Sequence, residues 1–259
     1  MRPFIVLLGL ACVGCGAGPA PLLAARTRVM VHRGSTGPEG TVAGCERSIA
    51  LGYEILEVDV RLTRDGHAVI LHDATVDRTT DGRGPVAALT LAELRRLDAG
   101  GGARIPTVEE LLRAVDGRAW VTLELKVLDA ADLAVQAIRA ADAFGWAVVR
   151  SQDLERLAAL RRAEPRLLTG AMAPFPEPAD LEAFVRRLSS LSFAAYTPRS
   201  NAAVTREAVR RFQSAGIAFW ATLENEAPAM RRLVAMGVDG LITDRPDVLR
   251  RVLTEAGGR

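Results

Sequence analysis

From residue 28 onward, short apolar segments alternate with amphipathic segments of helical period, and this alternation constrains the fold more than any other feature. Strands separated by helices pair in parallel, because parallel pairing needs a crossover connection between successive strands. The predicted strands are Val29–His32, Ile55–Val60, Trp120–Lys126, Ala147–Ser151, Leu167–Met172, Phe193–Thr197, Ile217–Thr222 and Gly240–Thr243. Eight strand–helix units predict an α/β fold of the TIM (β/α)₈ barrel type, although a doubly wound sheet would give a similar pattern.

The intervals between these strands carry the predicted helices, and the 259 residues suit a single barrel domain. The clearest helices are Thr107–Val115, Asp132–Phe144, Leu154–Ala163, Asp180–Leu188 and Thr205–Ala215. Of these, Thr107–Glu110 reads as a capping box, which predicts a helix start at that position. No segment of low complexity indicates a second domain.

One region, about residues 60–106, interrupts the alternation. The strand-like run Ala68–Leu71 follows the second strand too closely for a parallel crossover. Asp65-Gly66 between the two runs is typical of a two-residue hairpin, and that turn would place Asp59 opposite His72. We therefore predict a hairpin over Glu57–Asp73, followed by a loop-rich insertion that reaches Pro106.

The first 25 residues resemble a leader and a linker, so that residues 26–259 form the barrel domain. Arg2 precedes an apolar run, Phe4–Leu10, that is too short to span a membrane, and small residues follow. Cys12 and Cys15 each follow a small residue, as at a bacterial lipoprotein cleavage site. We expect an exported protein that is periplasmic, anchored to the membrane through an N-terminal lipid, or otherwise secreted.

Four short segments hold most of the unusual polar residues: His32-Arg33-Gly34, Glu57-Val58-Asp59, His72-Asp73 and Glu124-Leu125-Lys126. Residues two apart in a strand point to the same face of the strand, so Glu57 and Asp59 share one face, and so do Glu124 and Lys126. Both pairs stand at the carboxyl end of a predicted strand, where barrel enzymes keep their active sites.

The residue types in these segments suit displacement at a phosphate diester. The carboxylates of Glu57, Asp59 and Glu124 form an all-oxygen ligand set for one hard divalent cation, Mg²⁺ or Ca²⁺. His32 and His72 suit a general acid and a general base, in either order, because imidazole titrates near neutral pH. Arg33 and Lys126, the only lysine of the chain, suit the binding of phosphate oxygens.

Together with further motifs, these segments resemble the glycerophosphodiester phosphodiesterase family from Val29 to Leu249. The further motifs are Pro38-Glu39, Asp77-Arg78-Thr79-Thr80, the run 89–94, Ile105-Pro106-Thr107 and the run 237–246. The resemblance implies a barrel with a small insertion after its second strand. It also implies Glu57, Asp59 and Glu124 as metal ligands, His32 and His72 as the catalytic pair, and hydrolysis of glycerophosphodiesters to glycerol phosphate and an alcohol.

Three positions depart from the family pattern: Gly40 replaces an asparagine, Gln152 follows Ser151 in place of a phenylalanine, and Ala221 separates Trp220 from Thr222. They affect the expected pocket shape rather than the chemistry. The Trp220 ring would pack against glycerol carbons or fill the barrel mouth. Asp244 is expected to anchor a loop or cap the last helix.

Two other functions fit the same residues. One is cleavage of lysophospholipids or sphingolipids, which would need an apolar rim that residues 81–105 scarcely supply; the other is an inactive lipoprotein that binds phosphate esters, which retention of the site residues disfavours. The formal net charge of +2, from 33 basic and 31 acidic residues, disfavours nucleic-acid binding. The expected partner is therefore a small phosphodiester, and no protein partner is implied.

Overall fold

The computed structural model describes residue 22 and residues 26–34 and 36–257. Most of the predicted leader, including both candidate lipidation cysteines, therefore lies outside the described residues. Within the described ranges, no helix has both the length and the apolar character needed to cross a bilayer. Cys45 is a buried free thiol in this part of the chain, and burial raises its pKa to about 12.

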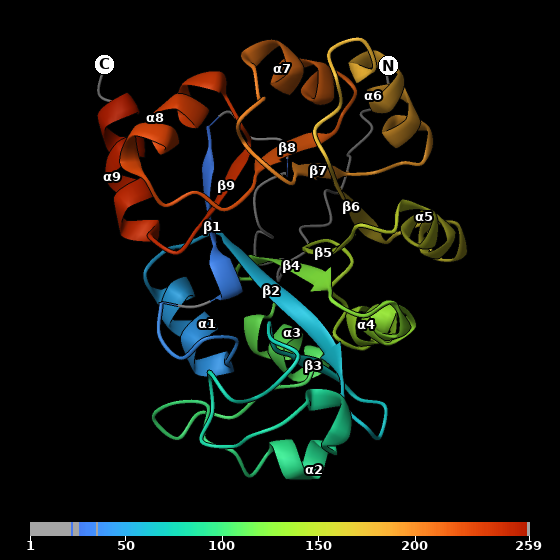
Figure 1. Ribbon diagram of the computed structural model, residues 1–259, viewed down its shortest axis with the longest axis vertical. Helices are drawn as coiled ribbons and strands as arrows, with labels where there is room; N and C mark the ends of the chain where they lie inside the picture. The colour runs from blue at the N-terminus through green and yellow to red at the C-terminus, as the bar shows by residue number, and fades with distance from the viewer. Residues whose placement is uncertain (1–21, 23–25, 35, 258–259) are drawn as a thin grey trace, which may run out of the picture.

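Eight parallel strands close into a barrel, which confirms the predicted fold (Figure 1). Closure follows from β1, which pairs with β2 on one side and with β9 on the other. The barrel strands are β1 (Arg28–Val31), β2 (Ile55–Leu62), β4 (Trp120–Leu125), β5 (Ala147–Ser151), β6 (Leu168–Ala173), β7 (Ala195–Pro198), β8 (Ala218–Ala221) and β9 (Gly240–Thr243). The bounds of all eight strands lie within two residues of the predicted ranges, because each apolar run has the length of one buried strand.

Helices surround this barrel and shield its strands from solvent (Figure 1). They are α1 (Val42–Ala50), α3 (Val108–Val115), α4 (Ala131–Ala140), α5 (Leu154–Ala163), α6 (Leu181–Ser190), α7 (Arg206–Ser214), α8 (Ala227–Met236) and α9 (Pro246–Gly257). The predicted capping box is present at α3, where the Thr107 hydroxyl accepts from the Glu110 backbone and Glu110 reaches back. Short 3₁₀ turns, η1 (His32–Gly34) and η3 (Leu128–Ala130), follow β1 and β4.

The predicted hairpin is present as β2 and β3 (Ala68–Ile70), but the prediction of a two-residue turn is wrong. The strands pair as Val60 with Ile70 and Leu62 with Ala68, one residue away from the predicted register. The backbone N–H of Gly66 donates to Thr63, and Gly66 has φ +80°, so the loop has three residues ending in a left-handed glycine. Asp59 therefore pairs with Leu71, whose N–H donates to the Asp59 carbonyl, and not with His72.

His72 still reaches the barrel mouth, because β3 ends at Ile70 and the chain bends from His72 to Ala74. Strand alternation therefore no longer fixes the direction of the His72 side chain. The insertion continues through η2 (Val86–Ala88) and α2 (Leu91–Leu94), and it packs around a small apolar cluster of its own. That cluster contains Val69, Leu71, Val76, Val86, Leu94, Ala99 and Ile105.

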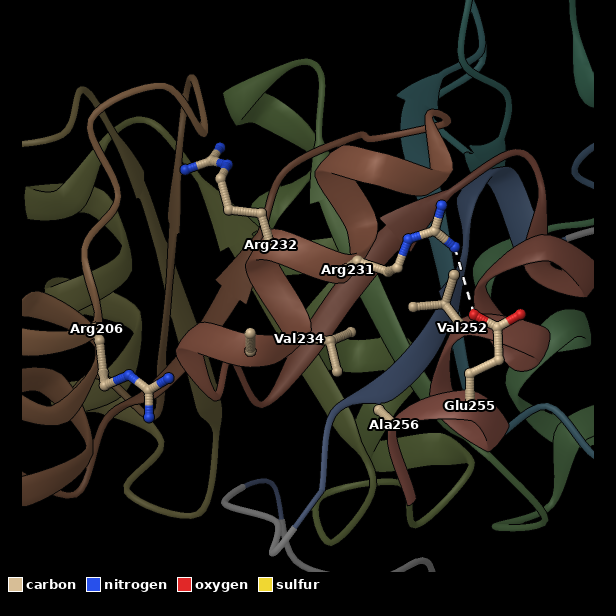
Figure 2. A pocket seen from close by; sticks show the side chains of 8 residues that line it. Arg206, Arg231, Arg232, Val234, Val252, Glu255 and Ala256 are labelled. Atoms are coloured by element: carbon tan, nitrogen blue, oxygen red, sulfur yellow. Dashed lines mark hydrogen bonds and ion pairs between the residues drawn. The ribbon is translucent and has the colours of Figure 1, made fainter. Parts of the chain in front are cut away.

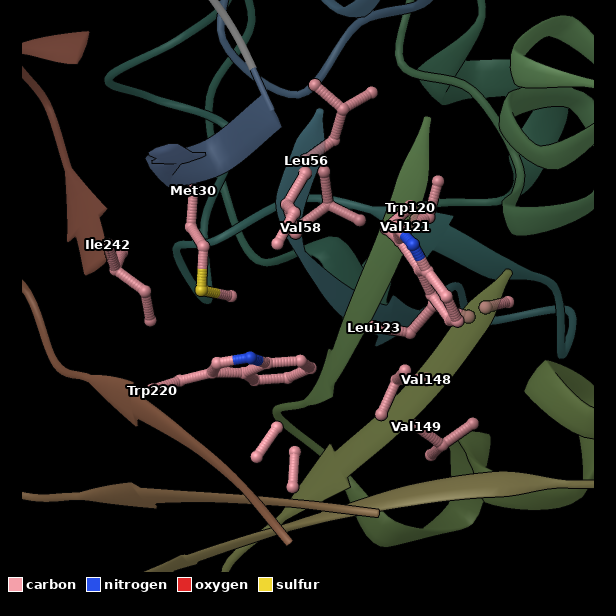
Figure 3. Close-up of a cluster of buried hydrophobic side chains, with 14 of the residues drawn as sticks. Met30, Leu56, Val58, Trp120, Val121, Leu123, Val148, Val149, Trp220 and Ile242 are labelled. Atoms are coloured by element: carbon pink, nitrogen blue, oxygen red, sulfur yellow. The ribbon is translucent and has the colours of Figure 1, made fainter. Parts of the chain in front are cut away.

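The barrel interior is filled by apolar side chains, among them Trp220 (Figure 3). The Trp220 indole extends from β8 across the interior near Met30 of β1, and it is fully buried. Gly240 makes this possible, because a Cβ atom there would lie 2.9 Å from the Trp220 ring and 2.6 Å from the Met30 sulfur. This placement favours the packing role of Trp220 over the predicted contact with substrate.

Candidate active site

Three carboxylates converge at the carboxyl ends of β2 and β4. One oxygen each from Glu57, Asp59 and Glu124 lies within 4.8 Å of the others, and we call this group the carboxylate trio. The parallel register pairs Asp59 with Glu124, and strand alternation places Glu57 on the same side as Asp59. The sequence-based expectation that these side chains share one space is therefore met.

Charge in the trio is only partly balanced by the protein. Burial, followed by repulsion from Asp59, raises the pKa of Glu57 to about 8. Burial also acts on Glu124, but attraction from Arg150 and Lys126 outweighs it and lowers the pKa of that carboxyl. Three closely packed carboxylates thus require either a proton or a further cation.

The donor set suits a hard divalent cation. Its ligands are carboxylate oxygens, and no sulfur ligand lies among them. On one side of the trio, the Lys126 ammonium lies 2.5 Å from Glu124 and 3.0 Å from Asp59. Lys126 is thus directed toward the site, as predicted, and its position shows that the trio attracts positive charge.

His32 lies at the end of β1, and its ring is held by an aspartate from the opposite end of the sequence. The distance from His32 Nδ1 to Asp244 Oδ1 is 2.6 Å. Asp244 also accepts a hydrogen bond from Asn225, and these hydrogen bonds lower its pKa although burial opposes them. Asp244 is therefore the partner of a histidine rather than only a loop anchor, and it engages His32 through Nδ1 rather than Nε2.

His72 is held in the same manner by its neighbour in sequence. His72 Nδ1 lies 2.7 Å from Asp73 Oδ1, and the rings of His32 and His72 are 6.4 Å apart. Arg78 donates to both Asp73 and Glu39, so the insertion is tied to the segment after β1. The hydrogen bonds from Arg78 and then from His72 hold the pKa of Asp73 well below its ordinary value.

Arg33 follows His32 in a left-handed conformation, with φ 56°, and Gly34 follows with φ +70°. This tight turn lets the Arg33 backbone N–H donate to Glu57. The Arg33 guanidinium bonds both oxygens of Glu39 at 3.1 and 3.0 Å, beside a small cavity that His72 also lines. Arg33 is thus near the site, but Glu39 holds its guanidinium.

One charged residue of the site, Arg150, was not predicted from the sequence. It lies on β5 beside Glu124 in the register and is 1% exposed. Its guanidinium lies 3.5 Å from Glu124 and 3.7 Å from Glu57. The signal available in the sequence was an arginine inside an otherwise apolar strand, near its carboxyl end.

A larger groove, of about 630 Å³, lies on the outside of the barrel between α7, α8 and α9 (Figure 2). Its charged lining consists of Arg206, Arg231, Arg232 and Glu255, with an ion pair of 3.4 Å between Arg231 and Glu255. None of the predicted site residues lines this groove. The trio and the two histidines are therefore the better candidate for chemistry.

Comparison with known proteins identifies a family that this chain resembles over most of its length. Residues 32–248 match the model of the glycerophosphoryl diester phosphodiesterase family. A glycerophosphodiester phosphodiesterase of Caldanaerobacter subterraneus subsp. tengcongensis is 30% identical over 90% of this chain and 100% of its own length.

Two solved structures share the architecture. A phosphodiesterase of Oleispira antarctica, in complex with the product sn-glycerol-3-phosphate, is 25% identical with a TM-score of 0.77, over 91% of this chain and 100% of that one. A glycerophosphodiester phosphodiesterase of Agrobacterium tumefaciens is 26% identical with a TM-score of 0.71, over 87% of this chain and 99% of that one.

Proposed function

Since the chain belongs to the glycerophosphoryl diester phosphodiesterase family, we propose that it hydrolyses glycerophosphodiesters to glycerol phosphate and an alcohol with one divalent cation and two histidines. The chain is an enzyme of the phosphoric diester hydrolase class. The observation that carries the proposal is the convergence of the carboxylate trio beside two histidine rings that are 6.4 Å apart. The glycerol phosphate in the Oleispira relative supports the choice of product.

Glu57, Asp59 and Glu124 would hold the cation, Mg²⁺ or Ca²⁺. When bound, a divalent cation polarises the phosphoryl group and offsets the charge that builds on its oxygens. Lys126 already lies between two of the ligands, so its ammonium can bind a phosphate oxygen next to them. Arg33 would add a second positive contact by exchanging part of its bonding with Glu39.

The two histidines would move the protons of the reaction. One imidazole takes a proton from the attacking water as its oxygen bonds to phosphorus. The other donates a proton to the leaving alcohol oxygen as the old P–O bond breaks, so that charge does not accumulate on either oxygen. Asp244 and Asp73 orient the two rings through Nδ1, so Nε2 of each is the nitrogen that exchanges the proton.

The proposed function is tested with purified protein and a panel of glycerophosphodiesters and lysolipids. Excess chelator should abolish turnover, and Mg²⁺ or Ca²⁺ should restore it, because three carboxylates cannot polarise a phosphate unaided. Full turnover in excess chelator would exclude the metal, and turnover of lysolipids alone would exclude glycerophosphodiesters as the substrate class.

Export belongs to the same proposal. The apolar segment Phe4–Leu10 followed by small residues supports a cleaved leader, and Cys12 or Cys15 would carry the lipid. Cell fractionation with mass spectrometry of the mature N-terminus tests it. A full-length chain that starts at Met1 would contradict both cleavage and lipid attachment.

A further inference from the structure

The interior of the barrel contains a buried positive charge beside the carboxylate trio. Arg150 lies on β5 beside Glu124 of β4, which itself lies beside Asp59 of β2. These residues form one row across neighbouring strands, and their side chains point to the same side of the barrel wall. Arg150 is 1% exposed, so solvent does not screen its charge as it would at a surface.

The contacts of Arg150 are directed at the trio but are long. Its Nη2 atom lies 3.5 Å from Glu124 Oε2 and 3.7 Å from Glu57 Oε1. Nη1 is 3.4 Å from the Thr122 hydroxyl, and the buried Nε has no hydrogen-bond partner within the part of the chain that the structure describes. Arg150 therefore acts on the carboxylates mainly through its charge, since a well-formed guanidinium–carboxylate pair would be about 2.7–2.9 Å long.

Two other strands leave room for this side chain. At Gly170 of β6, a Cβ atom would lie 2.8 Å from Cγ of Arg150, so a larger residue there would displace the arginine. The Trp220 ring lies 5.9 Å from the Arg150 guanidinium and offers it a π face. The space for the Arg150 side chain is thus bounded by Gly170, which has no side chain, and by the aromatic ring of Trp220. Together they fix the position of the guanidinium charge.

Among the described residues, Arg150 and Lys126 are the two positive side chains that form ion pairs with the trio, and they differ in one respect. Lys126 is 21% exposed at the mouth, where a substrate phosphate can reach it. Arg150 is buried inside the barrel, so it stays with the carboxylates throughout a reaction cycle. A fixed positive charge at this distance favours the ionised forms of Glu57 and Glu124 and at the same time repels a divalent cation that binds to them.

We propose that Arg150 is the fixed counter-ion of the trio. Its charge stabilises the carboxylates when no cation is bound, and it weakens the binding of the divalent cation. Arg150 is therefore a positioning residue for the metal ligands, with no contact to substrate. This inference rests on the proposed function in one respect, namely that the trio binds a divalent cation. If Arg150 weakens the binding, the bound cation should exchange with cations in solution rather than remain permanently bound.

The inference is tested by calorimetric titration of metal-free protein with Ca²⁺ at constant pH and ionic strength. Arg150→Met keeps much of the side-chain length and removes the charge, and it should bind Ca²⁺ at least about tenfold more tightly than the wild type. Arg150→Lys should stay within about threefold of the wild type, because the charge is retained. Arg28→Met is the matched control, because Arg28 is 2% exposed and stands at the start of β1, whereas the trio lies at the carboxyl ends of β2 and β4.

Thermal melting gives a second readout that does not depend on turnover. Metal-free Arg150→Met should melt below the wild type and gain more from saturating Ca²⁺, since the cation replaces the missing charge. Equal or weaker Ca²⁺ binding by Arg150→Met would overturn the inference. If that variant does not fold, Arg150→Gln provides the same comparison. Absence of Ca²⁺ binding by the wild type would instead refute the metal part of the proposed function.

Discussion

The pairing of His32 with Asp244 leads to a prediction for Asp244→Asn. Asn225 Oδ1 accepts from the Asp244 backbone N–H at 2.9 Å and from the Thr243 hydroxyl at 3.0 Å. The Asn225 amide group must then direct its NH₂ toward Asp244 Oδ2, at 2.8 Å. An asparagine at position 244 would turn its own oxygen toward that NH₂ and present a donor to His32.

The expected loss in Asp244→Asn follows from the two bonds that change. A hydrogen bond to a charged group contributes about 1.5–3 kcal/mol, and an ordinary one about 1 kcal/mol. Asp244→Asn loses the hydrogen bond between His32 and the charged carboxylate, and it also loses the acceptor that faced His32 Nδ1. The two losses together cost about 2.5–4 kcal/mol of stabilisation, which corresponds to a decrease of about 10²–10³-fold in kcat. The donor would also leave the proton of His32 on Nε2, the nitrogen proposed to exchange it.

The double variant Asn225→Asp/Asp244→Asn is the matched test. An aspartate at position 225 accepts from Thr243, from the backbone of residue 244 and from the new amide, which frees the amide oxygen at position 244 to accept from His32. The kcat of the double variant should therefore exceed that of Asp244→Asn by at least about tenfold. This factor corresponds to the free energy of one restored hydrogen bond to the His32 ring. Steady-state kinetics at saturating cation measure both variants. A single variant within about threefold of the wild type, or a double variant no better than the single one, would refute the proposed pairing and its role.

Three further predictions concern other parts of the molecule. His72→Ala should lower kcat about 10²–10⁴-fold with little change in melting temperature, and near wild-type turnover would remove His72 from the mechanism. Gly34→Ala should cost about 2–4 kcal/mol in denaturant unfolding, since the new Cβ would lie 2.7 Å from Val58 in a left-handed residue. Gly52→Ala, with the same conformation but open space, should cost less, and equal losses would contradict the packing explanation. Hydrogen bonds from Arg166 and Arg139 lower the pKa of Glu164 to about 2, so its contribution to stability is complete above about pH 4.5 and is lost toward pH 2. The stability difference between the wild type and Glu164→Gln should close over that interval, and a constant difference would contradict it.

Most of the fold could be predicted because the information is local. Each barrel strand is a short apolar run, and each run ends close to where the strand ends in the structure. The shared side of Glu57 and Asp59 follows from strand alternation alone. The carboxylate trio was therefore accessible from the sequence, since its members lie on two strands that pair in order.

The hairpin register was not accessible in the same way. Asp65-Gly66 fits a two-residue turn and also the end of a three-residue loop, and the two choices differ by one residue in pairing. His72 nevertheless lies near the site because it stands beyond the strand. A correct neighbourhood was thus predicted for an incorrect reason.

Pairings between distant strands were also inaccessible. Asp244 and His32 are 212 positions apart and meet because β9 closes the barrel against β1. Arg150 appears as one charge in an apolar strand until the register places it next to Glu124. Only the closed geometry shows that both residues belong to the site.

The insertion has an apolar cluster separate from that of the barrel, and this division affects how the enzyme would fail on heating. His72 and Asp73 follow β3 in the insertion, whereas the trio and His32 lie on barrel strands or at their ends. Segments with small separate cores open at lower free energies than the whole domain. Heat inactivation should therefore precede the loss of barrel structure, as a reversible event in which one acid–base group leaves while the cation ligands stay assembled.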